Sequence, residues 1–149
     1  MKLLAGIALF ILCALMGERR ARWLQRREQA LSKFHELIRR IGDRQLSGLV
    51  SFSEAALGCP PSKEREELLK LSRGEGVETP LLTGEETARL LAYARSESRS
   101  VEALRSERDA LLVLLEQERD RTKEEWTHKG QLYRSVGYLC GAAALLLVL

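Results

Sequence analysis

Both ends of this chain are apolar, and the segment between them carries almost all of the charge. Residues 3–17 and 135–149 contain no Asp, Glu, Lys or Arg. Lys2 is the one basic residue outside 18–134, so the middle segment holds 23 of the 24 Lys and Arg and all 21 Asp and Glu. This pattern predicts membrane segments at 1–17 and 135–149, with a charged domain at 18–134 between them. The near balance of charge argues against nucleic acid, which favours a one-sided basic face.

Basic residues flank both apolar ends, each time on the side of the middle segment. These flanking residues are Arg19, Arg20, Arg22, Arg26, Arg27, Lys129 and Arg134. Because Lys and Arg beside membrane segments stay in the cytoplasm, we expect these seven to determine the topology. The middle domain would then be cytoplasmic, with both termini outside. A secreted protein with a cleaved signal is an alternative, although residues 14–17 fit a cleavage site poorly.

Each apolar end is short for a membrane span. Fifteen helical residues cover roughly 22 Å, against a hydrocarbon core of ~30 Å, so shallow insertion stays open beside full spanning. Gly137 and Gly141 are four residues apart, a spacing that lets two membrane helices approach closely. We hypothesise that the two ends pack together there, with Ala5, Gly6 and Ala8 as small surfaces on the first. The alternative is that small residues are simply common in membrane helices.

Five helical stretches are predicted, giving an all-α bundle with short apolar ends and a long carboxyl-terminal stalk helix. The first should run to Ile41, where Gly42-Asp43 would end it. Capping boxes at 51–54 and 83–86 predict two helix starts, and Ser62 predicts another. Loops are expected at 74–80 and 96–100. One face of the first helix should be buried, at Leu24, Leu31, Phe34, Ile38 and Ile41. The core is thin for the length of the domain, which favours a partner or a homo-oligomer.

No pattern in the sequence indicates catalysis, a cofactor or a metal site. There is no glycine loop followed by Lys and Ser or Thr, so a nucleotide-binding loop is excluded. His35 and His128 are far apart in the sequence, and no Cys stands at ligand spacing from either. Paired glutamates stand at predicted helix starts, where the helix dipole accounts for them. We therefore expect a protein that is not an enzyme.

The run 129–141 carries a family resemblance. Its sequence is Lys129-Gly130-Gln131-Leu132-Tyr133-Arg134-Ser135-Val136-Gly137-Tyr138-Leu139-Cys140-Gly141. Leading into a terminal apolar helix, it resembles the stage III sporulation protein AB family. Residues 82–91 are similar to that family's helix before its last one. The likeness weakens at 50–55, where only an apolar residue, Glu54 and Ala55 match, and the middle segment is shorter than the family's.

The resemblance implies a place in the channel complex that joins mother cell and forespore in endospore-forming bacteria. The family's soluble domain is similar to platform proteins of type II secretion and type IV pilus machines. The implied partners are an ATPase of the stage III sporulation protein AA type and other channel components. The chain would be a non-enzymatic platform or adaptor at the mother-cell membrane facing the forespore, coupling that cytoplasmic ATPase to the channel. The alternative is a membrane-anchored helical scaffold that organises a division or envelope site without a motor.

Overall fold

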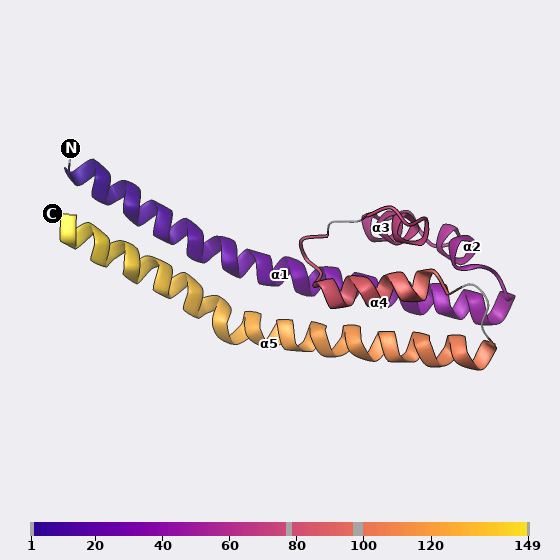
Figure 1. The fold of residues 1–149 in the computed structure, drawn as a ribbon. Helices are drawn as coiled ribbons and strands as arrows, with labels where there is room; N and C mark the ends of the chain where they lie inside the picture. The colour runs from indigo at the N-terminus through magenta and orange to yellow at the C-terminus, as the bar shows by residue number, and fades with distance from the viewer. Residues whose placement is uncertain (1, 77–78, 97–99, 149) are drawn as a thin grey trace. The chain divides into compact units, whose positions relative to one another are not determined.

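The computed structural model describes residues 2–76, 79–96 and 100–148, and most of these residues are helical. These residues form five helices and no strand (Figure 1). The helices are α1 (Lys2–Gly48), α2 (Phe52–Leu57), α3 (Lys63–Ser72), α4 (Gly84–Ala94) and α5 (Val101–Val148). The prediction of five helices is confirmed. Parts of the predicted loops, residues 77–78 and 97–99, lie outside the described residues, as do residues 1 and 149 of the predicted membrane segments.

Three short helices begin where the side chains of their first turns predict. Ser51 Oγ accepts a hydrogen bond from the Glu54 amide at 3.3 Å, and Glu54 Oε2 accepts one from the Ser51 amide at 3.3 Å. Thr83 and Glu86 form the same reciprocal pair, at 3.3 and 2.7 Å. Ser62 Oγ caps α3 by accepting from the Arg65 amide at 3.1 Å. Each cap satisfies amides that a helix start otherwise leaves without partners.

The predicted end of α1 at Ile41 is wrong, because the helix continues to Gly48. Gly42 is buried, and a Cβ there would overlap the Arg108 side chain and lie 3.2 Å from the Tyr93 hydroxyl. The glycine therefore makes room for neighbouring side chains rather than breaking the helix. The following residue, Asp43, forms an ion pair with Arg108 of α5, in which Arg108 Nη1 lies 2.9 Å from Asp43 Oδ1. This ion pair fixes the turn against α5. The chain leaves the helical conformation only at Leu49, with φ at 49°.

The chain divides into two compact units, and α1 and α5 each contribute to both. Unit 1 consists of residues 1–28 and 120–149, and unit 2 consists of residues 29–119. The domain boundaries expected at 17/18 and 134/135 follow the change in hydrophobicity, and they stay a prediction.

Unit 2 has one hydrophobic core to which all five helices contribute. Leu31, Phe34, Ile38 and Ile41 line it from α1, as their spacing predicts, and each is at most 1% exposed. The other helices add a larger set, including Phe52, Ala56, Leu68, Leu90, Tyr93, Leu111 and Leu115. Burying a side chain of this size contributes about 1.5–3 kcal/mol, so this cluster is the main source of stability in unit 2.

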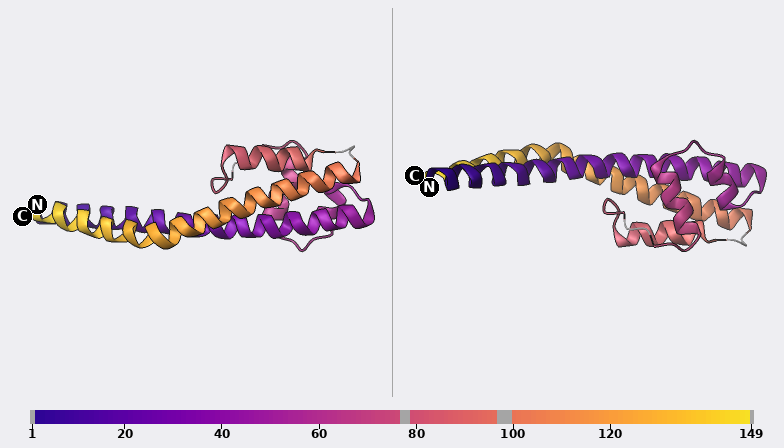
Figure 2. Two further views of the ribbon diagram at one scale, coloured as in Figure 1. Left: turned by 90° about the horizontal axis from the view of Figure 1, so that it is seen from below. Right: turned by 90° about the horizontal axis from the view of Figure 1, so that it is seen from above.

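Unit 1 is a pair of antiparallel helical arms. Arm 1 is residues 2–28 of α1, and arm 2 is residues 120–148 of α5. Figures 1 and 2 show the two arms side by side from several directions, with the N and C termini at the same end of unit 1. Leu24 of the predicted apolar face lies here and is 2% exposed. Both apolar ends of the sequence therefore belong to one structural unit.

Candidate functional site

Glycines bring the two arms of unit 1 into backbone contact. A Cβ on Gly137 would lie 2.9 Å from the Cys13 carbonyl oxygen, and one on Gly141 would lie 3.0 Å from the Phe10 carbonyl oxygen. On arm 1, a Cβ on Gly17 would lie 2.5 Å from the Tyr133 carbonyl oxygen. Only residues without a side chain allow such an approach, which is the usual reason for small residues between membrane helices.

The structure places both glycines singled out on arm 2 against arm 1, and it adds a partner that the sequence pattern did not indicate. Gly17 faces Gly137, since a Cβ on Gly137 would lie 3.3 Å from the Gly17 Cα. Of the small residues expected on arm 1, Gly6 is buried, while Ala5 and Ala8 are exposed. Gly17 could have been found from its helical spacing, because it lies eleven residues, three helical turns, after Gly6.

Large apolar side chains cover the outside of the arms. Leu12 of arm 1 is 57% exposed and Leu139 of arm 2 is 69% exposed. The same holds for further residues on both arms, namely Leu4, Ile7, Leu9, Ile11, Leu15, Met16, Leu132, Val136, Leu146 and Leu147. Unit 1 thus buries Gly6, Gly137 and Gly141 and exposes most of its large apolar side chains, the reverse of what water favours. An exposed apolar surface of this kind marks contact with a partner or a membrane.

The basic residues expected to determine topology occupy different surroundings. Arg19, Arg20, Arg26, Lys129 and Arg134 are exposed, and so is Arg22, whose Nε lies 3.1 Å from Glu18 Oε1. Arg134 Nε lies 3.7 Å from Glu18 Oε2 across the two arms, and Lys129 pairs with Glu125 at 3.9 Å.

Arg27 differs from the other basic residues because it is buried between the arms. Arg27 is only 7% exposed. Its Nε donates a hydrogen bond to Thr122 Oγ1 at 3.4 Å. Its guanidinium also lies 5.8 Å from the centre of the Trp23 ring. This hydrogen bond joins the two arms, so Arg27 has a packing role that its position in an arginine run did not indicate.

Across the described residues, no helix combines the length with the apolar character that crossing a membrane requires.

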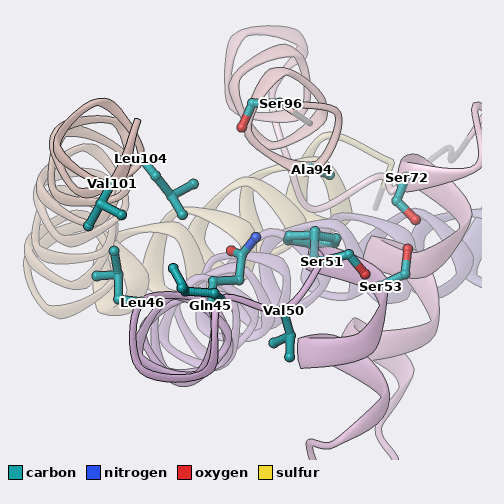
Figure 3. A pocket seen from close by; sticks show the side chains of 12 residues that line it. Gln45, Leu46, Val50, Ser51, Ser53, Ser72, Ala94, Ser96, Val101 and Leu104 are labelled. Atoms are coloured by element: carbon teal, nitrogen blue, oxygen red, sulfur yellow. The ribbon is translucent and has the colours of Figure 1, made fainter. Parts of the chain in front are cut away.

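Unit 2 contains a pocket of about 410 Å³ where the ends of several helices meet. Figure 3 shows Leu46, Val101 and Leu104 on one side of it and Ser51, Ser53 and Ser72 on the other. Gln45 points into the middle, where its Oε1 accepts a 3.0 Å hydrogen bond from the Tyr93 hydroxyl. Among the described residues, the twelve that line the pocket include no ionisable side chain, so these twelve supply no general acid, general base or charged ligand.

Two buried titratable residues of unit 2, Tyr93 and Glu86, have structural roles. Burial raises the pKa of Tyr93 to about 12, and the positive charge of Arg108 acts in the opposite direction. The Tyr93 ring packs edge-on against Phe52 with centroids 5.9 Å apart, so it belongs to the core. Glu86 is buried as the second half of the α4 capping box. Over the described ranges, no three His, Cys, Asp or Glu residues gather in a way that could hold a metal ion.

Comparisons of the chain with protein-family models, with curated proteins and with solved structures find no match.

Proposed function

We propose that this protein is a non-enzymatic, membrane-attached platform or adaptor. In this proposal it couples a cytoplasmic secretion-type ATPase to the channel that joins mother cell and forespore. The membrane segments correspond to the ends of the two arms, and unit 2 is the cytoplasmic part that meets the ATPase. The protein resides in the mother-cell membrane facing the forespore.

The observation that carries the proposal is the reversed packing of unit 1. In water, a helix pair gains stability by burying its large apolar side chains. Here Gly17, Gly137 and Gly141 occupy the interface, while Leu12 and Leu139 point away from it. Lipid removes the penalty of exposing leucine, and the association of helices then depends on close backbone contact. A bilayer around the ends of the arms accounts for both halves of this pattern.

The resemblance to the stage III sporulation protein AB family rests on the same residues. The run 129–141 that carries it lies wholly within arm 2 and includes both glycines that contact arm 1. A pattern that combines these glycines with apolar and aromatic residues is what a lipid-facing, closely packed helix needs. The resemblance and the packing of unit 1 therefore support the proposal through shared residues.

Two long helices supply a mechanical route for the proposed coupling. α1 and α5 each continue without a break from unit 2 into unit 1. In the proposed coupling, a displacement imposed by an ATPase would act on the same two helices that form the arms. Unit 2 presents charged side chains on its surface, such as the Lys33–Glu64 pair at 3.4 Å, that a protein partner could contact.

Binding to the ATPase is the test of the proposal. The full chain is placed in lipid nanodiscs and mixed with a purified ATPase of the stage III sporulation protein AA type, with empty nanodiscs as the control. We expect co-purification at micromolar concentrations, and charge reversal of exposed residues in unit 2 should weaken it. Attachment to the nanodisc without any ATPase binding would contradict the adaptor function and favour the motor-free scaffold.

A further inference from the structure

Positive charge is concentrated in unit 1, next to the exposed apolar side chains. Unit 1 holds ten of the 24 Lys and Arg but only five of the 21 Asp and Glu, a formal charge of +5. Unit 2 holds the other 14 basic and 16 acidic residues, a formal charge of −2. The basic character of the chain therefore comes from unit 1, the smaller of the two units.

One face of arm 1 changes from apolar to basic along its length. Arg19, Arg22 and Arg26 follow one another at intervals of three and four residues, so they share a face of the helix. Trp23 lies on the same face. Leu12, Leu15 and Met16 precede this group on the same helical spacing and are exposed. We call the group Arg19, Arg22, Trp23 and Arg26 the arginine stripe.

Within the described residues, two cations of the stripe form no ion pair with an acidic side chain. Arg22 pairs with Glu18, but in the described part of the chain no carboxylate forms an ion pair with Arg19 or Arg26. The guanidinium carbon of the neighbouring Arg20 lies 4.8 Å from the centre of the Trp23 ring. This stacking places the Trp23 ring and the Arg20 cation at the same surface. Exposed guanidinium groups without an internal counter-ion are available for phosphate, which they bind through paired hydrogen bonds.

We propose that the arginine stripe binds the phosphate headgroups of anionic phospholipids at the membrane surface. The inference rests on the proposed attachment to a bilayer and adds a preference for one lipid class. Apolar side chains followed by arginines and a tryptophan on one helix face match the order of acyl chains, interface and headgroups. Duplex nucleic acid is the other polyanion that such a stripe could meet, but the adjoining leucines would find no partner on it.

Tryptophan quenching by brominated lipids tests this preference in the full chain. A Trp126→Phe background leaves Trp23, inside the stripe, as the reporter. The protein is reconstituted in zwitterionic vesicles that contain a fixed fraction of brominated lipid, either anionic or zwitterionic. We expect the anionic lipid to occupy sites beside Trp23 roughly fivefold more favourably, the effect of about one arginine at an anionic surface. This preference should shrink at high salt.

Two paired substitutions separate the stripe from charge in general. R19Q/R26Q should bring the anionic preference to about one. The matched control R39Q/R105Q removes two exposed arginines from unit 2, one on α1 and one on α5, and should leave the preference unchanged. Equal quenching by both lipids in the parent chain would overturn the inference, as would duplex DNA binding that R19Q/R26Q weakens without any lipid preference.

The failure of the lipid preference and the failure of the proposed function give different results. A chain that does not float with vesicles of either composition contradicts membrane attachment, and both proposals fall together. A chain that floats with vesicles and quenches equally with both lipids overturns the stripe's role only.

Discussion

Replacing Gly137 by alanine adds one methyl group where the two arms meet. Its Cβ would lie 2.9 Å from the Cys13 carbonyl oxygen and 3.3 Å from the Gly17 Cα. Both atoms belong to the backbone, so no rotation of a side chain relieves the overlap and arm 2 has to shift. Overpacking of this kind costs about 1–3 kcal/mol.

Gly130→Ala is a matched control in the same helix. Gly130 is also buried in arm 2, but the three heavy atoms nearest to a Cβ there all belong to the Trp126 side chain, the closest at 3.3 Å. Both substitutions gain about 1 kcal/mol of intrinsic helix propensity, so this gain cancels in the comparison. The free energy of unfolding should therefore be about 1–3 kcal/mol lower for Gly137→Ala than for Gly130→Ala.

The two tryptophans make this difference measurable for unit 1. Trp23 and Trp126 both lie in unit 1, so the midpoint of the tryptophan emission change reports on the arms. The full chain is unfolded from mild-detergent micelles by increasing SDS, and circular dichroism follows the helix content of both units in the same titration. Equal free energies for the two variants, within ~0.5 kcal/mol, would refute close packing at Gly137.

Three further predictions concern unit 2. Leu31→Ala should lower the free energy of unfolding by about 2–5 kcal/mol in thermal denaturation, because Leu31 is fully buried. Thr83→Ala should cost about 1 kcal/mol by removing the cap of α4, whereas Thr83→Ser should be nearly neutral in the same assay. Tyr93 has its pKa raised above 10 to about 12 in the folded state, so its contribution is present below pH 10 and is lost as the pH rises toward 12. Between pH 10 and pH 12, the free energy of unfolding of the wild-type chain should fall by about 2–3 kcal/mol more than that of Tyr93→Phe. Parallel pH profiles of the two free energies would contradict this.

Local signals in the sequence predicted the short helices well. The helix starts at Ser51, Ser62 and Thr83 depend on hydrogen bonds between residues three apart, so neighbouring residues determine them. The buried face of α1 was equally accessible, because helical periodicity alone brings Leu31, Phe34 and Ile38 together.

Features that depend on distant residues could not be read in this way. Gly42 looks like a helix stop until Arg108 and Tyr93 are placed beside it. Arg27 looks like one more surface cation until Thr122, 95 residues away, accepts its hydrogen bond. In both cases the role of the residue comes from a tertiary contact that local spacing does not encode.

Solvent access to the outer faces of the arms is the sharpest test of membrane attachment. Single cysteines replace Leu12, Leu139 and, as a water-exposed control in unit 2, Glu85, in a chain whose three native cysteines are changed to alanine. The full chain is reconstituted in vesicles and treated with a water-soluble maleimide under non-denaturing conditions. If lipid covers the arms, the cysteines at 12 and 139 should react far more slowly than the cysteine at 85. Equal labelling rates at all three positions would mean that water reaches the outer faces, and membrane attachment through these arms would be contradicted.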